Sequence, residues 1–136
     1  MMINAWLQSI GLLILRVSFG TMMLAGHGLD KLLHFGQKSG TFPDPLGISS
    51  IFSLGLATFA EFFCSILVIL GLGTRFAAIP LVVTMLVAAV NHHAADEWKV
   101  KEPAVAYLVA FVVILITGSG PFGLDRFFRF RGQRKV

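Results

Sequence analysis

The segment ATFAEFFCSIL (residues 57–67) places a carboxylate in the middle of an apolar run. Across residues 48–73, Glu61 is the only charged residue. A helix of that length, rising ~1.5 Å per residue, is long enough to cross the ~30 Å hydrocarbon layer of a membrane. The sequence therefore predicts a transmembrane helix with Glu61 near its centre.

The composition of the whole chain agrees with a membrane location. Hydrophobic residues make up 56% of the chain, charged residues make up 13%, and the mean hydropathy is +0.81. Three more apolar runs cover residues 5–26, 76–91 and 104–120. These runs are continuous rather than alternating with polar residues, which favours helices over the strands of an outer-membrane barrel. We therefore predict an all-α integral membrane protein, a four-transmembrane-helix bundle forming a single domain over residues 1–136.

The distribution of lysine and arginine predicts the topology. A basic tail, residues 125–136, and Arg75 fall on one side of the four spans, and they outweigh the lysines of the opposite side. The positive-inside rule then places both termini in the cytoplasm and residues 28–48 in a long external loop. Because the tail directly follows a span, its mixed basic and aromatic residues indicate contact with anionic lipid headgroups rather than nucleic acid.

Two opposite charges occur at the centres of neighbouring spans. Arg16 lies mid-way along the first apolar run, as Glu61 does along the second. A lone charge at that depth costs several kcal/mol, so we expect Arg16 and Glu61 to form an ion pair between the first two helices. Such a pair either fixes the helix register alone or takes part in proton transfer.

A second polar group is predicted at the external ends of the helices. At 100° per residue His27 shares the face of Arg16, and Lys31 follows one turn later. His92 ends the third span, and Tyr107 lies about one turn into the fourth. Together these four residues predict a pocket that binds a quinone, moves protons or ligates a metal. Metal binding is the weaker alternative because no metal motif is present, and a haem held by His27 and His92 is weaker too.

Motifs in this order and spacing resemble the DoxX family. They are Arg16 in the first span, HGLDK at residues 27–31, Glu61 in the second span, LGLGTR at residues 70–75, and the closing segment of residues 118–125. The closing segment differs from the family's usual Gly-x-Gly-x-x-Ser-Leu-Asp, because Gly123 stands where serine is expected. This difference questions any role of a serine hydroxyl at that position.

The resemblance implies a multi-pass protein of the bacterial inner membrane. The family is named for a subunit of a thiosulfate:quinone oxidoreductase or terminal quinol oxidase, so it implies quinone or quinol as cofactor and a protein partner subunit. It leaves a homo-oligomer open. The matching polar positions are Arg16, His27, Lys31, Glu61, Arg75 and Asp125.

Two classes of function follow from these residues. In the redox interpretation, Glu61, Arg16, His27 and Lys31 serve catalysis, while His27, Lys31, His92 and Tyr107 contact quinone. Electrons must then come from a partner, because the chain has neither a dinucleotide fingerprint nor a thiol pair. In the alternative interpretation the protein is a non-catalytic membrane scaffold for an oxidative-stress complex, or a small-solute carrier.

Overall fold

The computed structural model describes the backbone of residues 2–132 and the side chains of residues 3–129. Within this part of the chain, four helices are long and apolar enough to cross a membrane. They are Ile3–Leu33, Ser50–Leu70, Thr74–His92 and Trp98–Thr117. The predicted all-α, four-span membrane fold is confirmed, and the protein is a multi-pass membrane protein in contact with lipid. Residues 133–136 of the predicted basic tail lie outside the described residues.

The first span is a single long helix with one irregular turn. It comprises α1 (Met2–Met23), the π-helical turn η1 (Leu24–Gly28) and α2 (Leu29–Leu33), and α3 (Phe35–Lys38) follows after a break at His34. The hydropathy predicts that this span ends at residue 26. The helix instead continues, because Gly28 adopts ordinary helical angles. The predicted loop of residues 28–48 is therefore helical over most of its first half, and residues 39–49 form the irregular connection.

The second and third spans form a hairpin around a tight turn. The second span is α4 (Ser50–Thr58), η2 (Phe59–Cys64) and α5 (Ser65–Leu70), and the third is α6 (Thr74–Val87) and η3 (Ala88–His92). Gly71 and Gly73 both take the left-handed conformation between them, with φ of 71° and 55°. This conformation favours glycine and reverses the chain within three residues.

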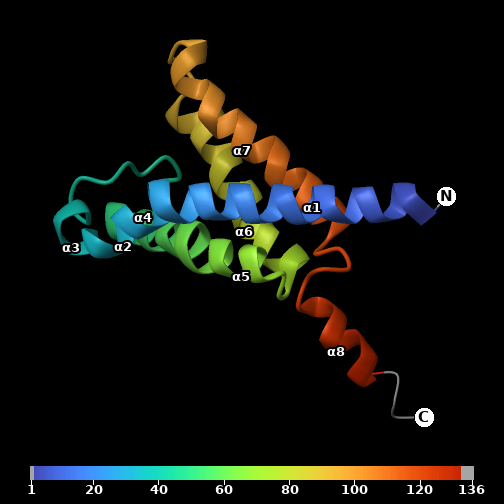
Figure 1. Ribbon diagram of the computed structural model, residues 1–136. Coiled ribbons are helices and arrows are strands. Elements are labelled where there is room, and N and C mark those ends of the chain that lie inside the picture. Colours follow the sequence, from blue (N-terminus) through green and yellow to red (C-terminus); the bar gives the residue numbers. More distant parts are fainter. Residues whose placement is uncertain (1, 133–136) are drawn as a thin grey trace.

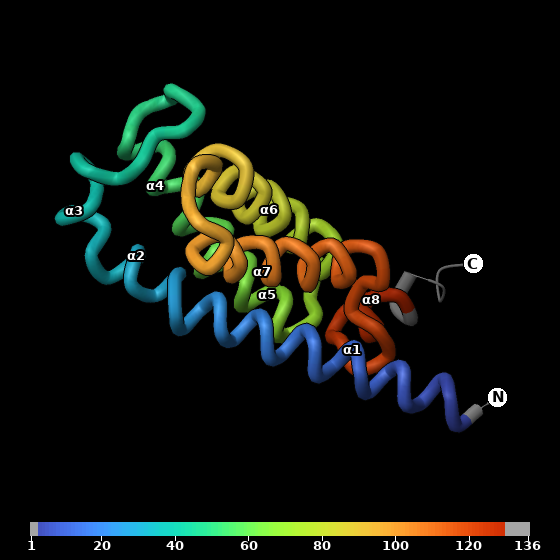
Figure 2. The backbone as a smooth tube through the Cα atoms, turned by 90° about the horizontal axis from the view of Figure 1, so that it is seen from above, coloured from blue at the N-terminus to red at the C-terminus, as the bar shows by residue number. Residues whose placement is uncertain are grey.

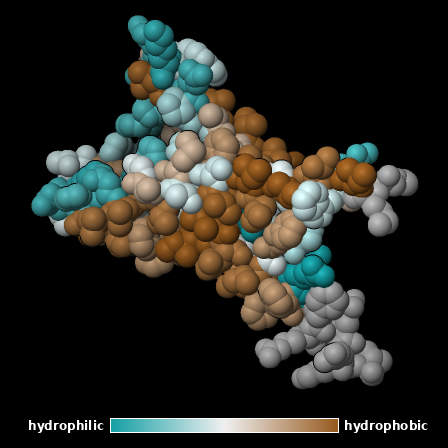
Figure 3. All heavy atoms as spheres, in the orientation of Figure 1, coloured by the Kyte–Doolittle hydropathy of each residue, from teal (hydrophilic) through white to brown (hydrophobic). Residues whose placement is uncertain are grey.

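The fourth span, α7 (Trp98–Thr117), returns along α6, and a short loop leads to α8 (Asp125–Gly132). The beginning of α1, the turn between α5 and α6, and α8 lie at one end of the bundle, which we call the terminal end (Figure 2). The opposite end, with α3 and the connection before α7, is the loop end. Polar side chains gather at both ends of the face shown in Figure 3, and apolar side chains cover the region between them.

The inward face of the second span includes small and polar residues. Its small and polar residues are buried, namely Ala57, Thr58, Glu61, Cys64 and Ser65, whereas Phe59 and Phe63 are exposed. The first span packs closely on this face, because a Cβ added at Gly28 would lie 2.3 Å from the Glu61 carbonyl oxygen. Small residues thus let the two backbones approach, as they do in many membrane helix pairs.

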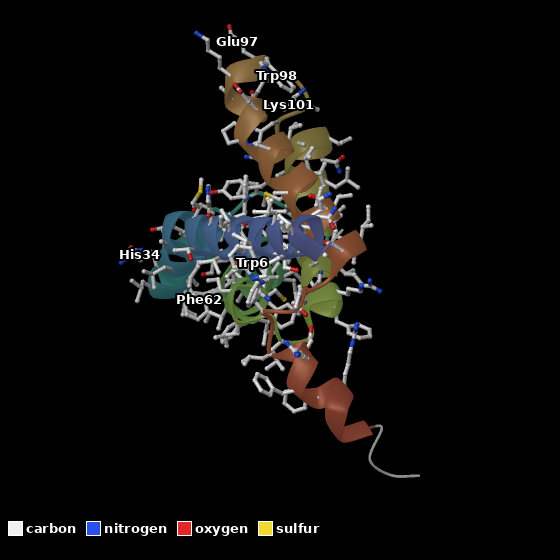
Figure 4. All side chains as sticks on the ribbon, turned by 45° about the vertical axis from the view of Figure 1, so that its right-hand side comes forward. Trp6, His34, Phe62, Glu97, Trp98 and Lys101 are labelled. Atoms are coloured by element: carbon white, nitrogen blue, oxygen red, sulfur yellow. The ribbon has the colours of Figure 1, made fainter. Side chains whose placement is uncertain are left out.

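The four spans divide into two arms that separate at the loop end. One arm contains α1, α2, α4 and α5, and the other contains α6 and α7, which slant away from α1 in Figure 1. Side chains at the tips of the arms lie far apart in Figure 4, with His34 on one tip and Glu97, Trp98 and Lys101 on the other. A pocket between the arms results, and it contains most of the predicted site residues.

Candidate functional site

The pocket at the loop end has a volume of about 470 Å³. It is bounded by both arms and covered by the connection of residues 39–49. Its walls are mainly aliphatic, proline and alanine side chains, with a few polar groups among them. Apolar walls with a few polar groups are typical of pockets that bind small organic molecules.

Five predicted site residues line this one pocket: His27, Lys31, Glu61, His92 and Tyr107. They come from all four spans. Three of them lie in the three π-helical turns, His27 in η1, Glu61 in η2 and His92 in η3. A π-helical turn interrupts the regular helix and frequently occurs at functional sites, because it redirects a side chain without ending the helix. Each span that has a π-helical turn therefore uses it to present a polar side chain to the pocket.

Glu61 is the buried carboxylate of the pocket, and its partner is Lys31. The distance from Lys31 Nζ to Glu61 Oε2 is 2.5 Å, and the two side chains are 15% and 6% exposed. Lys31 lies in α2, one turn beyond the close approach of Gly28 to Glu61. The pair satisfies both charges inside the bundle and keeps them at the pocket wall, where a ligand can reach either one.

His27 and Tyr107 form an aromatic pair across the pocket. Their ring centres are 5.6 Å apart and the rings are nearly perpendicular. Tyr107 is itself held by Phe19, edge to face at 5.8 Å, and by Phe111, stacked at 6.1 Å. Because Tyr107 is buried and fixed by these rings, it fixes the position of the exposed His27 imidazole in turn.

His92 reaches the pocket from the end of the third span. Its ring lies 4.5 Å from that of His93, which also lines the pocket. The Nδ1 atom of His93 lies 2.6 Å from an oxygen of Asp96, so His93 is held by the connection that precedes α7. His93 is not among the residues predicted for the pocket, although it directly follows His92 and η3.

Asp44 organises the connection that covers the pocket. Its carboxylate accepts hydrogen bonds from the backbone N–H groups of Ile48 and Ser49 and from the Ser53 hydroxyl, each at 2.9 Å. Burial raises the pKa of Asp44, but these hydrogen bonds more than offset it and hold the pKa below its usual value. The prolines and Phe42 of this connection are thereby fixed over the pocket.

Arg16 lies outside this pocket, and the predicted Arg16–Glu61 pair is wrong. In the antiparallel packing of the first two spans, Gly28 is opposite Glu61 while Arg16 is opposite Gly71. Arg16 precedes Gly28 by about three turns, roughly 18 Å along the helix axis. The prediction failed because the two helices are offset along their axes: Arg16 lies near the middle of the first span but opposite the end of the second.

Arg16 instead ties together the terminal end of the bundle. Its guanidinium donates to the carbonyl oxygens of Ser119, at 3.0 Å, and Phe122, at 3.4 Å. Asp125, in the same segment, is close enough to attract it electrostatically. The arginine is 2% exposed, so these carbonyl groups replace the part of its hydration that its two terminal nitrogens lose. Its role is to hold the segment after α7 against the turn between α5 and α6.

Asp125 completes this arrangement by capping α6. Its two carboxylate oxygens accept hydrogen bonds from the backbone N–H groups of Gly73, at 2.6 Å, and Thr74, at 3.2 Å, where α6 begins. Its own N–H donates to the carbonyl of Gly71 at 2.8 Å. The motif residues at both ends of the sequence thus form one structural cluster at the terminal end.

The DoxX family profile matches residues 11–94, more than half of the chain. The chain belongs to the DoxX family. The matched region contains Arg16, His27, Lys31, Glu61 and His92, whereas Tyr107 and Asp125 follow it. No curated protein and no solved structure matches the chain.

Proposed function

We propose that this DoxX-family protein binds the headgroup of a membrane quinone or quinol in the loop-end pocket and serves as a subunit of a quinone-linked redox system. The observation that supports this most directly is the convergence of a buried Lys31–Glu61 pair and two histidines on a mainly apolar pocket. A volume of about 470 Å³ accommodates a substituted ring, and the apolar walls suit its two faces.

The polar groups of the pocket match the chemistry of a quinone. Reduction of a quinone to a quinol takes up two electrons and two protons, and the protons bind to its two oxygens. Lys31 and His27 have N–H donors for a carbonyl oxygen, and histidine changes its protonation state near neutral pH. Glu61, paired with Lys31, provides a carboxylate that accepts or returns a proton beside the lysine.

The two electrons must be exchanged with a partner oxidoreductase that carries its own redox cofactor. The sequence has one cysteine and no dinucleotide fingerprint, so it contains no thiol pair for this step. In this proposal the protein binds and positions the quinone and handles its protons, and it resides in a bacterial inner membrane beside that partner.

Binding of a short-chain quinone to the purified protein in detergent tests the proposal. We expect His27→Ala and His92→Ala each to weaken binding about threefold to tenfold, the effect of one lost hydrogen bond. Tyr107→Phe keeps the aromatic ring, so it should change the position of His27 little. His34→Ala is the matched control, because His34 lies on α2–α3 outside the pocket lining and bonds to Asp30.

Mass spectra of small molecules that stay bound during gentle purification provide an independent measurement. If native protein retains no quinone and all three histidine variants bind the added quinone equally, the redox proposal is wrong. The scaffold interpretation would then account better for the same bundle.

A further inference from the structure

A second hollow lies at the terminal end of the bundle, on the opposite side from the proposed quinone pocket. It has a volume of about 490 Å³ and is lined by Arg75, Thr117, Ser119, Gly120, Arg126 and Arg129, together with Pro121. Three arginines from two separate parts of the chain therefore face one space. None of its described lining residues is acidic.

Asp125, in the same segment, caps α6. Both of its oxygens accept hydrogen bonds from the backbone at the start of that helix. It also attracts Arg16 electrostatically. The three arginines give the lining of the hollow a positive charge, which favours the binding of an anion.

The positions of these arginines are built into the fold. Arg75 donates from Nη2 to the carbonyl of Ile116 at 3.1 Å, which holds its guanidinium across the end of α7. Gly118, with φ of 77°, lets the chain turn beside this side chain, since a Cβ there would lie 3.2 Å from Arg75 Nε. Arg126 and Arg129 are three residues apart in α8 and so share a face of that helix.

The depth of the hollow matches the headgroup layer of a membrane. Thr117 is the last residue of the fourth span and Arg75 is the second residue of the third, so both lie where the hydrocarbon region ends. On the other side of α8, Phe127 and Phe128 are 69% and 60% exposed. A helix with arginines on one face and phenylalanines on the other is suited to lie at that interface.

We infer that this hollow is a phosphate-binding site that takes the phosphate group of a phospholipid headgroup or of a soluble phosphate. Guanidinium groups bind phosphate oxygens through paired, charge-assisted hydrogen bonds, which ammonium groups cannot reproduce. Three guanidiniums around one space, supported by a helix end and a glycine turn, provide such bonds from several directions. The site is independent of the proposed quinone pocket.

The test measures binding of fluorescent phosphatidic acid to the full chain in detergent, with phosphatidylcholine as the zwitterionic comparison. The double variant Arg126→Gln/Arg129→Gln should weaken binding of phosphatidic acid at least tenfold, because charge-assisted bonds are lost. The double variant Arg126→Lys/Arg129→Lys keeps the charge and should still lose about threefold or more. The control Lys99→Gln/Lys101→Gln removes two charges from the loop end and should bind as wild type does.

Competition by inorganic phosphate distinguishes the two sources of the ligand. If millimolar phosphate displaces the lipid, soluble phosphate also occupies the site; if it does not, the site is specific for a lipid headgroup. Either result supports phosphate binding. Unchanged binding in the double lysine variant would overturn the inference, because a diffuse positive charge would then be sufficient. Equal losses in the glutamine variant and in the loop-end control would overturn it as well.

Discussion

Glu61 is a carboxylate buried inside the bundle, and Lys31 compensates its charge. An isolated carboxylate inside a membrane bundle loses several kcal/mol of hydration. The ion pair with Lys31, 2.5 Å long, offsets part of this loss. Gly28 makes the pair possible because it lets the two helix backbones approach closely. Such a pair contributes little net stability compared with an apolar pair, so its retention at a pocket wall favours a functional role.

The Lys31–Glu61 pair predicts a strong coupling between the two residues. Lys31→Met or Glu61→Gln alone should lower the free energy of unfolding by about 3–5 kcal/mol, because one buried charge is left without its partner. The double variant should lose much less than the sum of both. Unfolding in detergent followed by circular dichroism measures these values, and additive losses would contradict the pairing.

The surface pair of Lys38 and Asp30 provides a matched comparison for that cycle. Both side chains are substantially exposed, at 39% and 49%. Lys38→Met should therefore change the stability little, since water and salt screen an exposed pair. A large effect of Lys38→Met would mean that loss of any lysine at the loop end unfolds the protein.

Gly123 shows how this chain replaces the serine that the family motif leads one to expect. A Cβ at Gly123 would lie 2.3 Å from Ser119 Cβ and 2.6 Å from its hydroxyl, so Ser119 already occupies that space. The Ser119 hydroxyl is also close enough to Asp125 to help lower the pKa of its carboxyl group. The hydroxyl group is therefore present near Asp125, but it comes from a residue four positions earlier.

This exchange of positions is testable with two substitutions. Gly123→Ser alone should destabilise the protein by about 1–3 kcal/mol, because it overpacks the contact with Ser119. Adding Ser119→Gly should recover a large part of that loss by making room for the new side chain. Thermal unfolding of wild type, the single variant and the double variant decides the matter, and a double variant as unstable as the single one would refute it.

At the scale of elements, the π-helical turns explain what the sequence pattern misses. A period of 3.6 residues correctly predicts that Glu61 and Cys64 face inward while Phe59 and Phe63 face lipid. The same period gives no indication of η1, η2 or η3, because a π-helical turn departs from the regular α-helical repeat. Convergence of His27, Lys31, His92 and Tyr107 was nevertheless predicted, because they share one end of their spans. Glu61 was not included, because it lies near the middle of its span and was assigned to Arg16.

Arg16 shows the limit of arguments from hydropathy about depth. The apolar run ends near residue 26, but the helix continues with Asp30 and Lys31 in its last turns. Hydropathy detects where apolar residues stop, not where hydrogen bonding along the helix stops. Arg16 and Glu61 both lie near the middle of their helices, but the helices are offset, so Arg16 is opposite Gly71 and Gly28 is opposite Glu61. Hydropathy gives no information about such an offset.

The cap of α6 by Asp125 predicts a dependence of stability on pH. Burial raises the pKa of Asp125, but the bonds from Gly73, Thr74 and Ser119 outweigh it, so the pKa lies below its usual value. A carboxylate whose pKa is lowered in the folded state stabilises that state above its unfolded pKa, near 3.8. This stabilisation is lost as the pH falls below about 4 and through the folded pKa.

Asp125→Ala should therefore lower the stability at neutral pH by about 1–2 kcal/mol, as loss of a helix cap does. The difference between wild type and variant should shrink as the pH falls below about 4, where the wild-type carboxylate is protonated. Unfolding curves at several pH values measure both effects. Asp96→Ala, a change of the same kind at the loop end, controls for general effects of removing a carboxylate, and an equal pH dependence in both variants would exclude the cap as the cause.

At the scale of the whole molecule, the two ends of the bundle carry different chemistry. The loop end has the pocket with Lys31 and Glu61, and the terminal end has the cluster of Arg16 and Asp125 beside the arginine-lined hollow. Figure 3 shows polar surface at both ends of the displayed face. The excess of arginine at the terminal end does favour one orientation.

We expect the terminal end to face the cytoplasm. Arg75, Arg126 and Arg129 all lie there, within reach of the anionic cytoplasmic leaflet, and lysine or arginine near span ends sets the orientation of a membrane protein.

Single cysteines report this orientation in a Cys64→Ala background, which removes the buried native thiol. One cysteine replaces the exposed Gln37 in α3, and the other replaces Gln133, which follows α8 outside the described residues. An impermeant maleimide added to intact cells should label Gln37→Cys at once and Gln133→Cys after the membrane is opened. Labelling in the reverse order would place the loop-end pocket on the cytoplasmic side, and the electron partner would then have to be sought among proteins of that compartment.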